Sequence, residues 1–286
     1  QPGASNPARI RSSFGGVGRN VAENLARLGQ PVQLITALGA DRNGEDILAH
    51  AAALGIDCTA TLRVRKYPTA YYMGLFDKKS RLVHGVDDMR AISALTPSYL
   101  GRHRRRFEEA SMVFMDCNLP DESIEYVVDT CVHLGKPLVA DPASSAVALR
   151  LLPYLPHLYL TAPNSKEAGI LTGQPFDPSD REAALNAARH LTGLGVDVAL
   201  VTLAEFGVCY ATSKTNGHIP SIRTNVVDPT GAGDAMLAAV MFGLLNGMDI
   251  DDAVWLGVSA ASLALRTPGT VYTDLTLEKL YDQLPF

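Results

Sequence analysis

Residues 228–236, DPTGAGDAM, place two carboxylates around a glycine-rich turn just before a long apolar helix. Gly231, Ala232 and Gly233 carry little or no side chain, so their backbone can turn sharply and approach a ligand closely. If the helix begins near Asp234, its free N–H groups favour an anion such as phosphate. An acidic residue there also stabilises a plain helix start, so both interpretations stay open for this segment alone. It is not a Walker A loop, because no Gly-Lys-Ser/Thr follows the glycines.

A second glycine-rich turn, FGGVGRN at 14–20, also enters a helix. Gly15 and Gly16 bring backbone amides close to a ligand, and the Asn20 amide offers a donor and an acceptor to a pair of hydroxyls. The alternative is a tight turn with Asn20 at the surface. The segment fails as a dinucleotide fingerprint, since it lacks the third glycine and a clear preceding strand. A dinucleotide-binding oxidoreductase is therefore disfavoured.

A third segment, APNSKEAGIL at 162–171, has Asn164 three residues before Glu167. That spacing is typical of a capping box, in which the two side chains bond to the free amides of a helix start. The competing interpretation puts the same amide and carboxylate beside a magnesium-bound triphosphate. The segment by itself leaves both open.

The elements around these segments alternate between helix and strand. Helices that end at glycine join nearly continuous apolar strands, which predicts a parallel sheet with helices on both faces. Residues 57–88 break the rhythm: they alternate, are rich in Thr, Val and Tyr, and turn through DKKS, so we expect a short antiparallel sheet there. We also expect a hairpin turn around Asn216-Gly217. The predicted strands are 31–39, 111–117, 137–142, 158–163, 198–203 and 207–211, and the predicted helices are 20–29, 44–55, 123–135, 145–152, 165–173, 234–247 and 251–265.

The composition fits one soluble globular protein of enzyme size: of the 286 residues, 47% are hydrophobic and 19% charged, with a formal net charge of −5. The basic run 102–106 precedes Glu108 and Glu109 on an expected helix, which indicates a solvated face rather than a nucleic-acid surface. Four scattered cysteines predict neither a zinc site nor a disulfide framework. No apolar run is long enough to span a bilayer, and the start lacks the apolar core of a signal peptide. We therefore expect a cytoplasmic protein that binds neither membrane nor nucleic acid.

Together, GGVGRNVAENLARLG, APNSKE and DPTGAGDAM resemble, in order and spacing, the ribokinase-like (PfkB) carbohydrate kinases. The resemblance covers nearly the whole chain. It implies one α/β kinase domain over 1–286, a three-layer sandwich with a central mostly parallel sheet and a small β-sheet lid at about 57–88. It also implies phosphoryl transfer from ATP to a sugar or nucleoside hydroxyl with Mg²⁺. Family members usually open with a strand whose aspartate holds sugar hydroxyls, and we expect that strand to be missing from this sequence.

The resemblance also assigns roles to single residues. Asp234 matches the catalytic base, which accepts the proton of the attacking hydroxyl, and Gly231, Ala232 and Gly233 match the anion hole. The family often has glycine where this chain has Ala204. The positions that match the ATP site are Asn164, Thr202, Gly207, Gly231 and Gly233. The positions that match sugar contacts are Gly15, Gly16 and Asn20. The positions that match cation sites are Glu167 for magnesium and Asp228, a residue of the monovalent-cation loop that implies use of K⁺.

The segment SFGGVGRNVAENLARLG, together with VDDM at 86–89 and LVADPAS at 138–144, is most similar to the pseudouridine kinases of this family. This implies phosphorylation of the 5′-hydroxyl of a C-linked nucleoside. A uracil ring needs several hydrogen-bond partners, and we expect them on the lid from Thr69 to Asp88, with Asp88 as a candidate. The alternative substrates are adenosine, ribose or another sugar or nucleoside, and the alternative class is a non-catalytic nucleotide- or nucleoside-binding protein. An apolar lid sheet often pairs with its copy, which predicts a homodimer.

Overall fold

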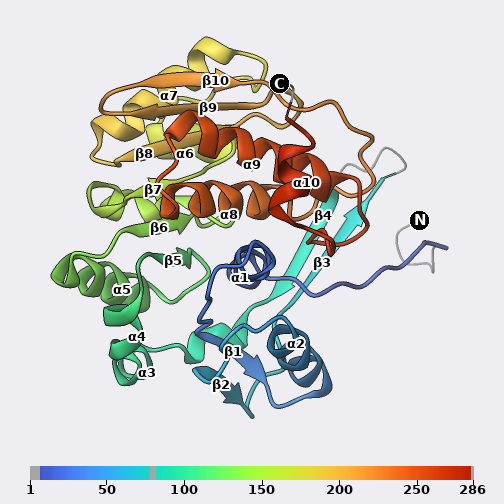
Figure 1. Ribbon diagram of the computed structural model, residues 1–286. Coiled ribbons are helices and arrows are strands. Elements are labelled where there is room, and N and C mark those ends of the chain that lie inside the picture. Colours follow the sequence, from blue (N-terminus) through green and yellow to red (C-terminus); the bar gives the residue numbers. More distant parts are fainter. Residues whose placement is uncertain (1–6, 78–81, 285–286) are drawn as a thin grey trace.

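A six-stranded sheet forms the centre of the computed structural model, which describes residues 7–77 and 82–284 (Figure 1). The first four of its strands in the chain run parallel, and the last two add antiparallel pairs. This confirms the central mostly parallel sheet. In spatial order the strands are β10 (Asn216–Ile219), β9 (Val208–Thr212), β8 (Val198–Thr202), β7 (Leu160–Thr161), β6 (Leu138–Asp141) and β5 (Val113–Asp116).

Helices cover both faces of this sheet and make a three-layer sandwich (Figure 1). Successive strand residues alternate between two hydrophobic cores: on β6, Leu138 and Ala140 pack in one core and Val139 in the other. The core of Val139 is closed by α1 (Val17–Arg27), α8 (Ala232–Leu245) and α9 (Ile250–Leu265). The opposite core is closed by α5 (Asp121–Leu134), the 3-10 helix η2 (Ala148–His157), α6 (Ser165–Thr172) and α7 (Arg181–Gly193).

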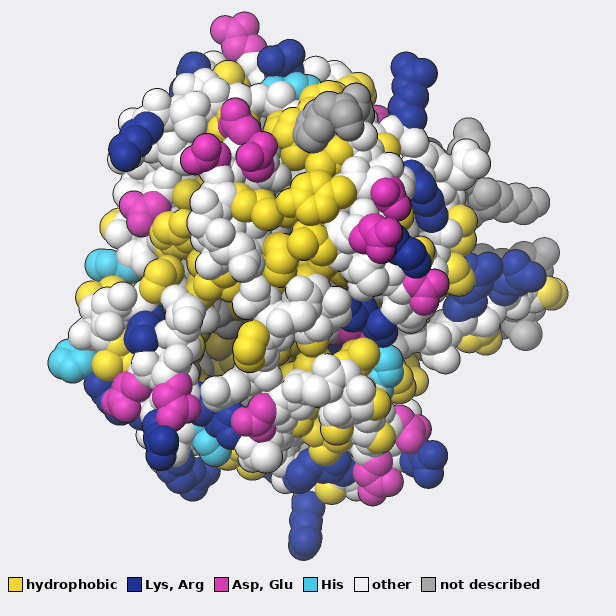
Figure 2. Space-filling model, in the orientation of Figure 1, with side chains coloured by type: hydrophobic (Ala, Val, Ile, Leu, Met, Phe, Trp, Pro, Cys, Tyr) yellow, Lys and Arg dark blue, Asp and Glu magenta, His cyan; other side chains and the backbone are white. Residues whose placement is uncertain are grey.

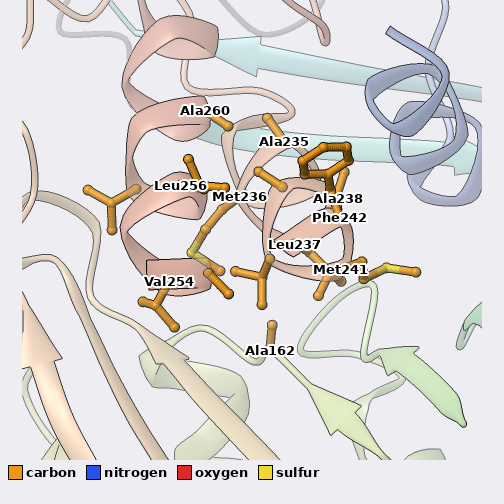
Figure 3. Packing of buried hydrophobic residues seen from close by; sticks show 14 of the residues in the cluster. Ala162, Ala235, Met236, Leu237, Ala238, Met241, Phe242, Val254, Leu256 and Ala260 are labelled. Carbon is orange, nitrogen blue, oxygen red and sulfur yellow. The ribbon is translucent and has the colours of Figure 1, made fainter. Parts of the chain in front are cut away.

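Helices α8 and α9 pack closely, and this contact fixes the helix that carries Asp234 (Figure 3). A Cβ atom at Gly257 would lie 2.7 Å from Val240 Cγ2 and 3.0 Å from Met236 Cγ, so the approach of the two helices requires glycine there. Figure 3 shows Met236 between the helices and Ala162 below the side chains of α8. Each large apolar side chain buried in this way stabilises the fold by about 1.5–3 kcal/mol, so α8 is firmly anchored.

A smaller unit comes before the central sheet in the chain. β1 (Thr36–Gly39) pairs in parallel with β2 (Thr61–Val64), and α2 (Arg42–Ala53) connects them. The expected single antiparallel sheet over 57–88 is therefore wrong for its first part. Only β3 (Tyr71–Phe76) and β4 (Leu82–Asp88) form an antiparallel pair, the lid. Of the expected DKKS turn, residues 78–80 lie outside the described residues.

Thr69 separates the small sheet from the lid. Its backbone amide donates to Asp41 Oδ2 at 2.7 Å, and its hydroxyl donates to Asp41 Oδ1 at 2.6 Å. The same hydroxyl accepts from the amide of Gly39 at 3.0 Å. These bonds fasten the chain to the end of β1 and the start of α2, so the strands before and after Thr69 belong to different sheets.

The predicted helix 145–152 is also wrong in kind and extent. The structure has the 3-10 helix η2 there, shifted toward the C-terminus and containing Pro153 and Pro156. Proline has no backbone N–H and clashes with the preceding turn, so an α-helix cannot continue through this segment.

The predicted hairpin turn lies earlier than Asn216-Gly217, which belong to β10. The chain turns at 213–215, where Thr212 Oγ1 accepts from the amides of Lys214 (3.1 Å) and Thr215 (3.0 Å). Gly217 instead lies against the Tyr210 ring, because a Cβ there would lie 2.7 Å from Tyr210 Cζ. The glycine therefore serves packing across the strand pair.

The basic run forms surface ion pairs. Arg104 pairs with Glu108 at 3.2 Å and Arg105 with Glu109 at 2.6 Å, along one helix. Figure 2 shows Lys and Arg side chains interspersed with Asp and Glu on the face in view. None of the helices that the structure describes has the length and apolar character needed to cross a membrane. The remaining helices are η1 (Arg90–Ala94), α3 (Pro97–Arg102), α4 (Arg104–Glu109), η3 (Ala204–Phe206) and α10 (Leu277–Tyr281).

Candidate active site

An open cleft lies between the ends of β5 and β6 and the lid. Ligands of such sheets bind beyond the carboxyl ends of the parallel strands, so this cleft is the candidate substrate site. The cleft continues between β1 and β5. Within the described residues β1 pairs only with β2, and β5 pairs only with β6. That a strand of the family is missing from this sequence stays a prediction. The residues that line it include Gly15, Gly16, Asn20, Tyr72, Asp87, Asp116, Asn118, Ser144, Asp234 and Thr270.

Asp234 is the third residue of α8 and lines this cleft. Gly231 precedes the helix in the left-handed conformation, and the first intrahelical donor is the Ala235 amide, 2.9 Å from Gly231 O. The amides of residues 232–234 come before this donor, so they have no carbonyl partner within the helix. Both predicted interpretations of the segment are thus compatible, since the helix start itself supplies free donors beside a carboxylate.

Asn20 contacts Asp234 directly. Asn20 Nδ2 donates to Asp234 Oδ2 at 2.6 Å, and Asn20 Oδ1 accepts from Arg19. This bond brings together two predicted segments that are 214 residues apart. Each end of the Asn20 amide already has a protein partner, so the structure directs this residue to Asp234, whereas its sugar contact stays a prediction.

The two glycines before Asp234 differ in what the fold requires. At Gly231 a Cβ would lie 2.7 Å from the carbonyl carbon of Thr270, and φ is +81°. At Gly233 a Cβ would meet no atom within 4 Å. The fold therefore demands glycine at 231 but leaves space at 233 that a ligand can occupy.

Burial raises the pKa of Asp234 to about 6 from 3.8. The hydrogen bond from Asn20 and the charge of Arg19 lower the pKa, while the Asp116 carboxyl raises it further. Above pH 7 the group is mostly a carboxylate, and its raised pKa makes it a stronger proton acceptor than an ordinary aspartate. A hydroxyl in the cleft would therefore meet a carboxylate that can accept a proton at the start of α8.

Sequence reasoning missed two acids near Asp234, namely Asp116 and Asp141. Asp116 Oδ2 accepts from the Gly18 amide at 3.3 Å, and Asp141 Oδ1 accepts from the Ala143 amide at 2.7 Å. Burial raises the pKa of both carboxyls, and the charge of Asp234 adds to the rise at Asp141. Each acid ends an apolar strand, VFMD and LVAD, and that position was the signal that could have found them. Arg19 and Thr270 were missed as well.

Asn164 and Glu167 form the predicted capping box of α6. Asn164 Oδ1 accepts from the Glu167 amide, and Glu167 Oε2 accepts from the Asn164 amide, each at 3.0 Å. Burial raises the pKa of Glu167, although its bond with Asn164 acts in the opposite direction. Asn164 also pairs with Thr202 across the ends of β7 and β8. The helix-start interpretation is confirmed, and a contact with ATP stays a prediction for these residues.

The turn after β8 has the backbone of a glycine-rich loop. Ala204 has φ +51° and Gly207 has φ +94°, both in the left-handed region that favours glycine. A Cβ at Gly207 would lie 2.8 Å from Pro220 Cα. This chain thus keeps a glycine-like conformation at Ala204. Asn164, Glu167, Thr202 and Gly207 lie outside the lining of the cleft that holds Asp234.

Asp228 fastens the loop that leads to Gly231. Its carboxylate accepts from the amides of Thr230 (3.0 Å) and Gly269 (3.3 Å). In the part of the chain that the structure describes, no three His, Cys, Asp or Glu side chains gather as metal ligands. A magnesium ion here would depend on phosphate oxygens and water for most of its ligands, as Mg²⁺ does with nucleotides.

The structure does not bring Asp88 into the cleft. Asp88 pairs with Arg90, with Nε at 2.9 Å and Nη2 at 2.6 Å from its oxygens, and these bonds lower the pKa of Asp88 to about 2. Side chains alternate along a strand, so the neighbouring Asp87 lies on the other face of the lid. Asp87 lines the cleft together with Tyr72. The lid acid available to a ligand is therefore Asp87.

Comparisons with known proteins give the family and the fold of the chain. The sequence model described as pfkB family carbohydrate kinase matches residues 1–276. The chain is 31% identical over 274 residues to pseudouridine kinase of Escherichia coli (strain K12), covering 96% of this chain and 86% of that protein. It is 26% identical over 261 residues to guanosine-inosine kinase of Exiguobacterium acetylicum, covering 91% and 86%. The structure of Arabidopsis thaliana ribokinase complexed with ribose and ATP superposes with a TM-score of 0.85 at 22% identity, covering 100% of this chain and 92% of that one, and shows the same fold.

Proposed function

Because the chain belongs to the pfkB family of carbohydrate kinases and is an ATP-dependent sugar or nucleoside kinase, we propose that it phosphorylates the 5′-hydroxyl of pseudouridine. Similarity to pseudouridine kinase over nearly the whole chain supports the choice of substrate. The observation that carries the chemistry is the 2.6 Å bond between Asn20 and Asp234, which joins the early glycine turn to a carboxylate of raised pKa.

In the proposed reaction the substrate hydroxyl oxygen bonds to the γ-phosphorus of ATP, the bond to the β–γ bridging oxygen breaks, and ADP leaves. Asp234 accepts the hydroxyl proton as the new bond forms. Asn20 holds Oδ2 of that carboxylate, which leaves Oδ1 for the hydroxyl. The amides of residues 232–234 donate to the oxygens of the transferring group, and loss of one such donor typically costs about 10²–10³ in rate.

Cations are a further part of the proposal. Magnesium, when bound, neutralises charge on the triphosphate. Glu167 is the carboxylate we assign to it, through water, since one Glu167 oxygen is engaged in capping α6. We assign K⁺ to the loop fastened by Asp228, whose carboxylate is engaged by two amides. Rates in potassium chloride and in choline chloride, at equal ionic strength, test the K⁺ assignment: equal rates would contradict it.

The substrate is tested by ADP release with MgATP and pseudouridine, uridine, adenosine, ribose or fructose 6-phosphate. We expect the highest kcat/KM with pseudouridine, and Asp234→Asn should abolish turnover. A preference for adenosine or ribose would contradict the substrate assignment. Turnover with none of them would instead favour a non-catalytic nucleotide- or nucleoside-binding protein.

The lid offers a matched pair of variants that test which residue contacts the nucleobase of the substrate. Asp87 lines the cleft, whereas its neighbour Asp88 is paired with Arg90. We expect Asp87→Asn to raise KM for the nucleoside and Asp88→Asn to leave it nearly unchanged. The reverse result would restore Asp88 as the substrate contact.

We also propose that the outer lid face pairs with a second copy of the chain. Met73 and Val86 lie opposite each other on β3 and β4 and are 67% and 66% exposed. A two-stranded sheet alone is only marginally stable in water, so an apolar cover would stabilise it. Sedimentation velocity should show a dimer that Met73→Lys dissociates. The control Val132→Lys, at a 54% exposed apolar position on α5, should leave the dimer intact, and a monomeric wild type would contradict the proposal.

A further inference from the structure

Arg19 is charged yet only 7% exposed, and the reaction above gives it no task. Its guanidinium lies behind the early glycine turn. Nε donates to Gly15 O and Nη2 donates to Phe14 O, both at 2.9 Å. Nη2 also donates to Asn20 Oδ1. The buried arginine therefore holds both the backbone of the turn and the side chain that contacts the base.

The contact with Asn20 decides which way that amide points. Arginine has only donors and an ionised carboxylate only acceptors, so an amide between them has one arrangement that satisfies both neighbours. That arrangement is the one observed, with Oδ1 toward Arg19 and Nδ2 toward Asp234. We propose that Arg19 is a positioning residue, which aims the Asn20 amide at Asp234 and thereby fixes the carboxylate that accepts the proton. This inference rests on the role proposed for Asp234.

Arg19 also connects the two glycine turns. Nη2 donates to Thr270 Oγ1 at 3.0 Å, and that hydroxyl donates to Phe14 O at 2.5 Å. The backbone of Thr270 lies against Gly231, where a Cβ would be 2.7 Å from the Thr270 carbonyl carbon. Loss of the guanidinium would therefore disturb the anion-binding turn as well as the Asn20 amide.

A second arginine on α1 provides the control. Arg19 donates to the Glu23 carboxylate, and Arg27 donates to the same carboxylate through Nε (2.9 Å) and Nη2 (2.6 Å). His50 Nε2 lies 3.0 Å from Glu23 Oε2. Burial lowers the pKa of Arg19, and the negative charge of Glu23 opposes that shift. Arg27 thus shares the helix and the ion pair but has no bond to Asn20 among those described.

The test compares Arg19→Lys with Arg27→Lys in steady-state kinetics over a range of pH. Lysine keeps the charge but lacks the planar fork, so we expect kcat of Arg19→Lys to fall about 10²-fold with KM for ATP little changed. The acid limb of kcat, where activity falls as pH drops, should move to higher pH. The bond from Asn20 lowers the pKa of Asp234, so its loss should raise that pKa, because the carboxyls of Asp116 and Asp141 remain nearby. Arg27→Lys should keep the wild-type limb and lose at most a few-fold in kcat.

An Arg19→Lys enzyme with the kcat and acid limb of Arg27→Lys would overturn the inference. If the variant misfolds, a measurement on the wild type still tests the inference. The side-chain amide resonance of Asn20 should be protected from exchange with solvent and should titrate together with Asp234. A freely exchanging amide would also overturn the inference. A wild-type profile without an acid limb would contradict the role of Asp234 itself, whereas a limb that Arg19→Lys leaves unmoved contradicts only the role of Arg19.

Discussion

Replacing Gly233 with alanine distinguishes a glycine that serves the fold from one that serves a ligand. The new Cβ would meet no atom within 4 Å, and the residue lies in the first turn of α8. Alanine is favoured over glycine inside a helix by up to about 1 kcal/mol. The fold alone therefore predicts a free energy of unfolding that is unchanged or slightly higher.

Gly231→Ala is the matched opposite. The left-handed conformation costs an alanine about 1–2 kcal/mol, and overlap with the backbone of Thr270 adds about 1–3 kcal/mol, because a backbone group cannot move aside as a side chain can. We expect the free energy of unfolding to fall by roughly 2–5 kcal/mol. The two variants should thus differ clearly in Tm although both exchange one glycine of the same turn.

Thermal unfolding and ADP release on both variants complete the test. Gly233→Ala should keep or raise the wild-type Tm, yet its kcat should fall about 10²-fold, since the Cβ would stand beside the amides that we propose to hold the transferring phosphoryl group. Gly233→Ala with wild-type kcat would refute the reasoning that this turn receives phosphate. A lowered Tm would refute the reasoning that the position faces open space.

The pKa of about 6 for Asp234 predicts that kcat falls as pH drops through 6, because the protonated carboxyl cannot accept a proton; the pH profile of the wild type measures this. That pKa lies above the usual 3.8, so the free energy of unfolding falls as pH rises from about 4 to about 6 and stays at the lower value above pH 6. Asp234→Asn should therefore raise the free energy of unfolding at pH 8 by up to roughly 3 kcal/mol, with a smaller gain at pH 5, which urea unfolding at the two pH values measures. Asn164→Ala should lower the free energy of unfolding by about 1 kcal/mol through loss of the cap of α6, whereas Ser165→Ala, one position into the helix, should change it little.

The features that sequence predicted correctly are those decided by local chemistry. Gly135 ends α5 in the left-handed conformation, with φ +61°. The spacing of Asn164 and Glu167 gives the capping box of α6. The apolar strands of the central sheet were visible because both of their faces are buried. The bond between Asn20 and Asp234 shows that two of the three glycine-containing segments meet, whereas the roles that the resemblance gives these residues stay predictions.

The features that sequence missed depend on distant partners. Residues 61–64 alternate like a lid strand, but Asp41 binds Thr69 and directs the lid away from them. Nothing local distinguishes Gly217 as a packing position against Tyr210 from a turn glycine. Arg19, on a helix beside other charged residues, has the local pattern of a solvent-exposed arginine. It is buried nonetheless, and one of its partners, Thr270, is 251 residues away in the chain.

Helix α1 belongs to two hydrophobic cores at once. Leu25 packs in the core under α8 and the central sheet, and Ala22 packs with the apolar residues beneath the small unit of β1, β2 and α2. In the described residues no strand pairing joins that unit to the central sheet. Helix α1, whose first turn carries Asn20, is therefore an apolar link between that unit and the core that holds α8. A substitution in α1 that loosens either core should therefore act both on the small unit and on the position of Asn20.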